Sequence, residues 1–119
     1  MANKNGFSIS VASKGSFAVL STDGPLNEEA GVRISEEAEK LLSQGVTRLV
    51  FNLGHALTIS SPTVAVFLDL SERIVDGKGG RVMFSGLTDL NLKVFEMVGI
   101  FLYADACPSV QEAEAQVML

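Results

Sequence analysis

The residues of this sequence best suited to chemistry are two adjacent serines, Ser60 and Ser61, which stand between a short apolar segment and a run of apolar residues at helical spacing. A serine in that position can cap the N-terminus of a helix, which contributes about 1 kcal/mol to stability. The same position suits a phosphoacceptor, because free backbone N–H groups and the positive end of the helix dipole stabilise an added phosphate. The spacing alone leaves both hypotheses open.

Catalytic chemistry has less support. His55 is the only histidine, and an esterase that used it with Ser60 or Ser61 would lack the Gly-x-Ser-x-Gly segment of a nucleophile elbow. Cys107 is the only cysteine, which excludes an internal disulfide and gives no metal framework. The glycine-rich residues 76–80 lack the spacing of a phosphate-binding loop and are interpreted as a turn. We therefore expect no catalysis, no metal and no cofactor.

The composition indicates a folded, acidic protein. Of its 119 residues, 47% are hydrophobic and 19% charged, which favours a single globular domain over residues 1–119. The net charge of −5 and the lack of basic clusters argue against a nucleic-acid partner. The N-terminal segment does not resemble a signal peptide, and no apolar run approaches the ~20 residues of a membrane span. We expect a cytoplasmic protein without membrane insertion; a homodimer is left open.

Short or alternating apolar segments predict five strands. The first two strands form a hairpin, and the third is a buried strand in the middle of the sheet. Residues 23–25, Asp-Gly-Pro, are expected to end the second strand, and residues 54–59 are expected to form a loop. The predicted strands cover residues 7–11, 17–20, 49–53, 81–84 and 101–103.

Four helices are expected between and after these strands, and the third is expected to turn Leu90, Val94, Met97 and Val98 towards the core. The alternation of strands and helices predicts an α/β domain with a mostly parallel sheet and right-handed crossovers. Each helix has a capping residue at its start: Asn27, Ser60 or Ser61, Thr88 and Ser109.

Several segments, taken in order, resemble the STAS domain family (sulfate transporter and anti-sigma factor antagonist). Residues 24–27, Gly-Pro-Leu-Asn, are similar to the family's Gly-x-Leu-Asp segment before its first helix. Residues 48–53 resemble its central strand, and residues 58–62 stand where it has a Phe-x-Asp-Ser-Ser/Ala-Gly loop. Residues 79–87 resemble its Gly-Gly-x-strand-x-Gly segment. The resemblance covers nearly the whole chain.

The resemblance implies a four- to five-stranded mixed β-sheet flanked by about four α-helices, and no enzymatic activity. The resemblance also implies that the protein is an anti-sigma factor antagonist, which binds an anti-sigma factor with a kinase fold. Phosphorylation of the first loop serine is implied to prevent that binding. That serine corresponds to Ser60, with Ser61 as second choice. The implied partner-binding residues are Asp23, Asn27, Thr58, Ile59, Ser60, Ser61, Pro62 and Thr63.

Three positions depart from the family pattern. Ile59 replaces the Asp before the serine pair, Pro62 replaces the Gly after it, and Asn27 replaces the Asp before the first helix. Two acidic positions near the serine are therefore lost. The alternative hypothesis is a STAS subunit that is not phosphorylated and that regulates or supports a transporter or a signalling assembly.

Overall fold

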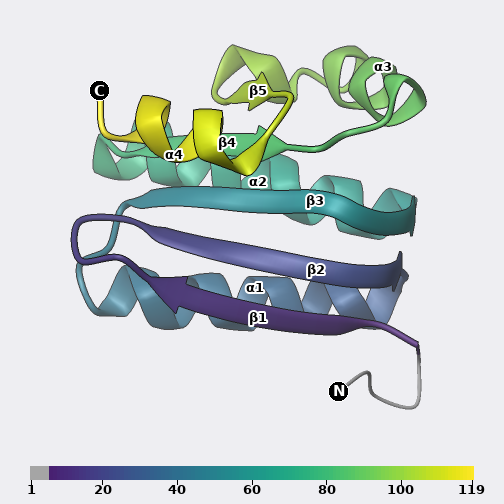
Figure 1. The fold of residues 1–119 in the computed structure, drawn as a ribbon, viewed down its shortest axis with the longest axis horizontal. Coiled ribbons are helices and arrows are strands. Elements are labelled where there is room, and N and C mark those ends of the chain that lie inside the picture. Colours follow the sequence, from purple (N-terminus) through teal and green to yellow (C-terminus); the bar gives the residue numbers. More distant parts are fainter. Residues whose placement is uncertain (1–5) are drawn as a thin grey trace.

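A computed structural model of the chain describes residues 6–119, and residues 1–5 of the N-terminal segment discussed above lie outside the described part. One mixed sheet has the strand order β1-β2-β3-β4-β5 (Figure 1). β1 pairs antiparallel with β2, and all other neighbours are parallel. The expected α/β sheet, with residues 49–53 in its middle strand, is confirmed. The strands are β1 (Ser8–Ser13), β2 (Ala18–Leu26), β3 (Arg48–Ile59), β4 (Arg81–Ser85) and β5 (Asp105–Cys107).

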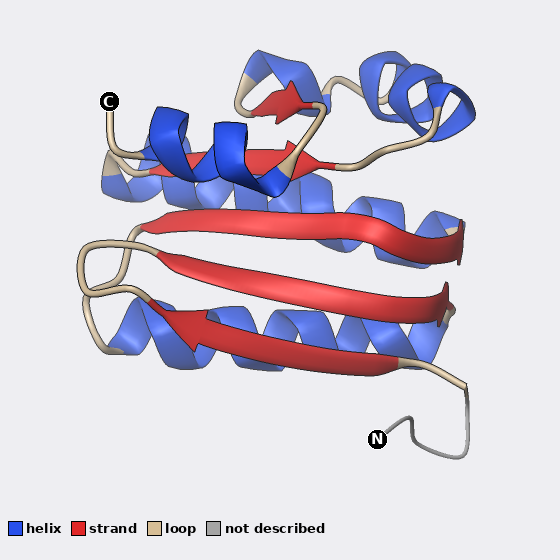
Figure 2. Cartoon of the chain, viewed as in Figure 1, coloured by secondary structure: helices blue, strands red, loops and turns tan. Residues whose placement is uncertain are grey.

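The helices cover the two faces of the sheet unequally (Figure 2). The long helices α1 and α2 lie side by side on one face, and the short α4 lies on the other. Each begins at the expected capping residue, whose side chain accepts a backbone N–H three residues further on. The helices are α1 (Glu28–Ser43), α2 (Ser61–Lys78), α3 (Asp89–Met97) and α4 (Val110–Val117), with a 3-10 turn at Ile100–Leu102.

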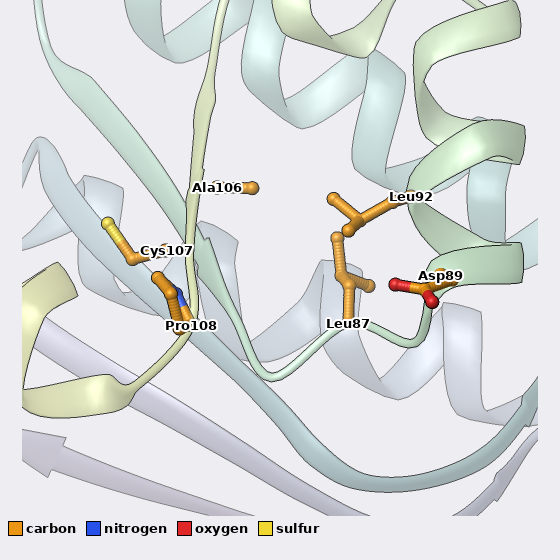
Figure 3. Close-up of a pocket in the computed structure, with 6 residues that line it drawn as sticks. All are labelled: Leu87, Asp89, Leu92, Ala106, Cys107 and Pro108. Atoms are coloured by element: carbon orange, nitrogen blue, oxygen red, sulfur yellow. The ribbon is translucent and has the colours of Figure 1, made fainter.

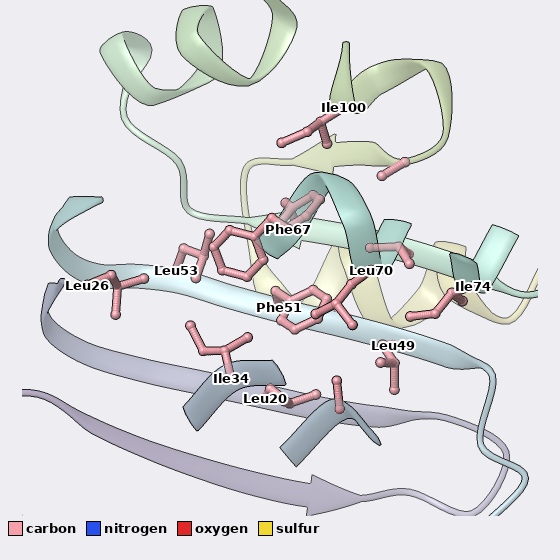
Figure 4. Close-up of a cluster of buried hydrophobic side chains, with 14 of the residues drawn as sticks. Leu20, Leu26, Ile34, Leu49, Phe51, Leu53, Phe67, Leu70, Ile74 and Ile100 are labelled. Atoms are coloured by element: carbon pink, nitrogen blue, oxygen red, sulfur yellow. The ribbon is translucent and has the colours of Figure 1, made fainter. Parts of the chain in front are cut away.

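The main core fills the space between the sheet and helices α1 and α2 (Figure 4). Phe51 and Phe84 project from neighbouring strands and stack with their ring centroids 5.4 Å apart. Phe67 of α2 meets both rings edge to face, at 5.1 and 5.3 Å. Such aromatic pairs add about 0.5–1.5 kcal/mol each beyond the area they bury. The cluster therefore fixes α2 rigidly against the middle of the sheet.

The two predicted breaks around the second and third strands are wrong. β2 continues through Gly24 and Pro25 to Leu26, and β3 continues to Ile59, which pairs with Leu26. The register shifts twice along this pair, so bulges absorb the proline that would otherwise disrupt the ladder. Gly24 has a φ of 93°, and a Cβ there would lie 2.1 Å from the Gly6 carbonyl oxygen. Only glycine fits this close approach.

Two further predictions are wrong near the C-terminus. Residues 101 and 102 belong to a 3-10 turn that Tyr103 follows, instead of a strand, because Gly99 has a φ of 89° and turns the chain sharply. The last strand is formed by residues 105–107, which lack an apolar pattern and pair only with β4. On α3, Phe95 is the buried residue, while Leu90 and Met97 are exposed.

Candidate functional site

Ser60 stands at the junction between β3 and α2 and caps that helix. Its Oγ accepts the backbone N–H of Thr63 at 3.3 Å, and its own N–H donates to the carbonyl of Leu26 at 2.8 Å. The Ser60 side chain is half-buried. The predicted N-cap is therefore Ser60, and the serine is attached both to its own helix and to the end of β2.

Thr63 extends this attachment towards α1. Its buried hydroxyl donates its single proton to the carbonyl of Asn27, at 2.8 Å, with the Leu26 carbonyl at 3.2 Å. Because that proton is used, Ser60 must be the donor in the 3.0 Å contact between the two hydroxyl groups. The Ser60 hydroxyl thus both accepts from and donates to Thr63. The start of α2 is held to the β2–α1 junction by a closed hydrogen-bond network.

Ser61 differs from Ser60 in exposure. It is the first residue of α2 and is exposed, and it lines a hollow beside the helix together with Ile59 and Val64. Pro62 follows and has no N–H group, so it removes one of the donors with which a helix N-terminus binds an anion. The N–H groups of Ser61 and Thr63 are the two that residues 61–63 supply.

The remaining predicted partner-binding residues fall into two groups. Asn27 and Thr58 border the serine, because Leu26 pairs with Ile59 in the sheet. Asn27 uses its side chain to cap α1, accepting the Ala30 N–H at 2.9 Å. Asp23 instead pairs with His55, four residues before Ile59, which is about 13 Å away at 3.3 Å per strand residue. Asp23 therefore lies at the margin of the predicted surface.

His55 lies away from Ser60. Ser60 stands five positions beyond His55, roughly 16 Å along the direction of β3, whereas a nucleophile and its base need hydrogen-bond contact. The Ser60 hydroxyl is already paired with Thr63. The arrangement expected of a Ser-His pair is thus not formed.

Cys107 lines another hollow, of about 370 Å³, together with Leu87, Asp89 and Pro108. In Figure 3 its sulfur points to the side of β5 away from Leu87, and it packs into the small core under α4. Burial raises the pKa of this thiol, and Glu112 and Asp105 raise it further. A protonated, buried thiol is a packing residue, as the sequence indicated.

Two features of the described residues bear on other functions. Within residues 6–119, no group of three or more His, Cys, Asp or Glu side chains could hold a metal ion. Over the same range, no helix has both the length and the apolar character needed to cross a membrane.

A protein-family model decides the classification, because the model of the STAS domain matches residues 8–113. The chain belongs to the STAS domain family. A search of curated protein sequences found no match.

Solved structures with this fold agree with the membership. Phosphorylated SpoIIAA from Bacillus is 20% identical with a TM-score of 0.74, covering 92% of this chain and 99% of that chain. An anti-sigma factor antagonist from Mycobacterium paratuberculosis is 13% identical with a TM-score of 0.84, covering 100% of both chains. A serine-to-glutamate variant of RsbS from Moorella thermoacetica is 12% identical with a TM-score of 0.78, covering 92% and 94%. At these identities the likeness shows a shared STAS fold.

The sequence did not single out two components of this region. The carbonyls of Leu26 and Asn27 accept the Thr63 proton, and such backbone partners leave no trace in side-chain pattern. The second is the exposed apolar side of α3, which the sequence pattern places in the core. Its signal was present as Leu90, Val94 and Val98 at four-residue spacing, which predicts an apolar stripe but not what covers it.

Proposed function

We propose that this STAS protein is a cytoplasmic anti-sigma factor antagonist that binds an anti-sigma factor with a kinase fold and has no enzymatic activity of its own. The observation that carries the proposal is Ser60, held at the N-terminus of α2 and bonded through Thr63 to the end of β2. The family membership and two similar structures, SpoIIAA and the mycobacterial protein, both called anti-sigma factor antagonists, support it.

The proposed binding surface surrounds Ser60 and includes Asn27, Thr58, Ile59 and residues 61–63, with Asp23 at its margin. A phosphate on Ser60 adds about −1.5 to −2 charges at neutral pH. The helix end can hold that charge through the N–H groups of Ser61 and Thr63, so the fold persists. A partner that covers this surface must desolvate the phosphate or place its own groups against it, and either weakens the complex.

Ser60 is the first candidate for the phosphoacceptor and Ser61 the second. Before Ser60 can be modified, its hydroxyl must give up the hydrogen bond that it donates to Thr63. A hydrogen bond of this kind is worth about 0.5–1.5 kcal/mol net, so the barrier to exposing the hydroxyl is small. Ser61 is already exposed and needs no such change.

A second function, a STAS subunit that binds its partner without being phosphorylated, is favoured by two specific observations. The Ser60 hydroxyl is fully engaged with Thr63. Ile59 and Pro62 stand where the family pattern has an acidic residue and a glycine. In that case the same surface binds a transporter or a signalling assembly permanently, without release by phosphorylation.

Phosphate transfer separates the two functions. The partner is first isolated from the native extract by affinity purification on the wild-type chain. The purified partner is then incubated with the chain, Mg²⁺ and ATP that carries a label on its γ-phosphate. We expect labelled phosphate to be transferred to the wild-type protein and not to the Ser60→Ala variant. Ser109→Ala should be labelled like the wild type, because Ser109 caps α4 in the same manner as Ser60 caps α2.

Label that persists in Ser60→Ala and disappears in Ser61→Ala would move the phosphoacceptor by one residue. A tight complex without any label, formed with a partner that binds no ATP, would contradict the antagonist function and support the constant subunit. Mass spectrometry of the labelled protein assigns the modified residue directly.

A further inference from the structure

Helix α3 has two apolar sides, and the fold buries only one of them. Phe95 is fully buried against the main core, whereas Leu90 is 70% exposed and Val98 is 43% exposed. Leu90, Val94 and Val98 recur every four residues and therefore form a stripe along one side of the helix. Within residues 6–119, Leu90 and Val98 are left exposed, and Val94 between them is half-buried against the main core.

Exposed apolar side chains are concentrated around this stripe. Nine large hydrophobic residues are exposed in the described part of the chain, and five of them lie at the end of β3, on α3 or in the 3-10 turn. Apolar surface gathered in one place marks an interaction site more often than the same surface scattered singly. The five residues are Leu57, Leu90, Met97, Val98 and Leu102.

The stripe forms one wall of a groove. A hollow of about 300 Å³ runs between α2 and α3, with Ala65 and Leu68 on one side and Val94 and Val98 on the other. A neighbouring hollow of about 530 Å³ lies between α3 and the end of β3. Ile59 and Val94 line both hollows, so the two are continuous. We call them together the α2–α3 groove.

Beyond the apolar lining of the groove, the same side of α2 is acidic. Glu72 and Asp76 follow Leu68 at four-residue intervals and so continue the same side of α2. The Tyr103 hydroxyl donates to Glu72 at 3.2 Å, and the resulting interactions with Glu72 and Asp76 raise the pKa of Tyr103. The second half of α2 has two basic residues: Arg73 is paired with Glu39 and Asp69, and Lys78 at the helix end forms no ion pair with Glu72 or Asp76 in the described part of the chain. Both carboxylates are therefore left to attract a cation.

We propose that the α2–α3 groove binds an amphipathic helical segment of the partner protein, with apolar residues against Val94 and Val98 and basic residues against Glu72 and Asp76. From Ser61 to Asp76 the groove side of α2 spans about 22 Å, which matches a helix of about 15 residues. A second copy of this chain is a poor occupant, because each copy carries a net charge of −5 and would bring carboxylates to this acidic end.

The orientation of the segment is consistent with control from the serines. Ser61 lines the apolar end of the groove, at the opposite end from Asp76. A phosphate at the start of α2 therefore faces the apolar part of the bound segment, where it is not compensated, instead of its basic part. The inference rests on the proposed function only in assigning the groove to the same partner, because the groove is defined without Ser60.

A displayed library of random peptides, about 16 residues long, tests the groove without knowledge of the partner. The wild-type protein is the bait, and the enriched peptides are synthesised and measured by fluorescence anisotropy. We expect them to carry apolar residues at helical spacing together with Lys or Arg. The double variant Leu90→Gln with Val98→Gln should lower their affinity about tenfold or more. Val32→Gln, an exposed valine on α1, is the matched control and should not change it.

Charge is tested in the same assay. Asp76→Lys should weaken binding about threefold or more, with a smaller loss at high salt, while Glu36→Lys on α1 should have no effect. Enriched peptides without basic residues, equal binding to the Leu90/Val98 variant, or no enrichment at all would overturn the inference. The inference would also be overturned if sedimentation experiments showed a dimer of the wild-type protein and a monomer of the Leu90/Val98 variant. The groove would then bind a second copy of this chain.

Failure of the groove and failure of the proposed function are distinguishable. If Ser60→Asp releases the purified partner but the Leu90/Val98 variant does not, the proposed function stands and the groove assignment is wrong. If the peptides bind the groove as expected but the partner is not an anti-sigma factor, the groove stands and the proposed function is wrong.

Discussion

Helices α2 and α4 both begin with a serine cap, and they lie on opposite faces of the sheet. Ser60 Oγ accepts the N–H of Thr63 at 3.3 Å, and Ser109 Oγ accepts the N–H of Glu112 at 3.2 Å. Beyond the cap, the surroundings diverge. At the start of α2, the Thr63 hydroxyl bonds to the carbonyls of Leu26 and Asn27 at the β2–α1 junction. Among the described residues, Ser109 has no comparable bond to a strand or to its junction.

The supports of the two helices also differ. α2 has 18 residues and packs Phe67 into the aromatic core, while α4 has 8 residues and buries Ala113 and Val117 in a small cluster. A serine cap is therefore local chemistry that any helix can have. What distinguishes the start of α2 is a rigid support below it and an open apolar groove beside it. A change of charge there alters the surface without loosening the fold.

The largest expected difference between the two regions concerns their cores. Phe67→Ala should lower the free energy of unfolding by about 3–5 kcal/mol, because a fully buried ring is lost. Val117→Ala, under α4, removes two buried carbons and should cost roughly 1.6 kcal/mol. Urea denaturation followed by circular dichroism measures both. Equal losses would show that α4 carries as much of the core as α2.

The next largest loss in the free energy of unfolding is expected for Thr63→Val. The substitution keeps the shape of the side chain but leaves the carbonyls of Leu26 and Asn27 without their shared proton. Each carbonyl keeps a backbone donor, Ser60 N–H on Leu26 and Gly31 N–H on Asn27, so the loss is that of two hydroxyl hydrogen bonds, one donated to these carbonyls and one accepted from Ser60. At about 0.5–1.5 kcal/mol for each bond, urea denaturation should show a loss of about 1–3 kcal/mol. A Thr63→Ser variant keeps the hydroxyl and serves as the control. If Thr63→Val is as stable as the wild type, the bond to the β2–α1 junction does not support the start of α2.

Removing either serine cap should lower the free energy of unfolding by a similar amount. Ser60→Ala and Ser109→Ala should each cost about 1 kcal/mol, the usual value for loss of an N-cap. Both measurements use the same urea titration. A cost for Ser60→Ala that greatly exceeds that of Ser109→Ala would mean that the cap itself, and not its surroundings, distinguishes α2.

The smallest effect is expected at Cys107, on the α4 side. Burial raises the pKa of its thiol, so iodoacetamide should react with it more slowly than with the urea-unfolded chain. Because the folded pKa lies above the unfolded one, the stabilising contribution is complete below the unfolded pKa and declines as the pH rises past it. Cys107→Ala should lack this alkaline decline. Equally fast alkylation of folded and unfolded protein would contradict the assigned burial.

Much of the fold follows from short-range patterns. The four capping residues and the central strand are visible because each depends on a few neighbours in sequence. The continuation of β2 through Pro25 and of β3 to Ile59 is not visible, because the pairing that stabilises each strand comes from the other. Turn-forming residues there produce bulges instead of ends.

The site shows the same limit. Ser60 is identified by its place before an apolar helix, and Thr63 lies three residues on in the same cap. The carbonyls of Leu26 and Asn27, which accept the Thr63 proton, are 37 and 36 residues away in the sequence and depend on tertiary contact. Likewise, the stripe of Leu90, Val94 and Val98 indicates an apolar face without indicating that this face is left open. Periodicity predicts that a surface should be covered, and only the fold shows whether it is.

The most direct measurement of the central claim is the affinity of the purified partner for Ser60→Asp and Ser109→Asp. Aspartate is a good N-cap, so both variants keep their helices and differ only in where the charge is placed. Isothermal titration calorimetry should show Ser60→Asp weakened about tenfold or more and Ser109→Asp unchanged. Equal affinities, or a loss at Ser109→Asp alone, would contradict the assignment of the partner-binding surface to the start of α2.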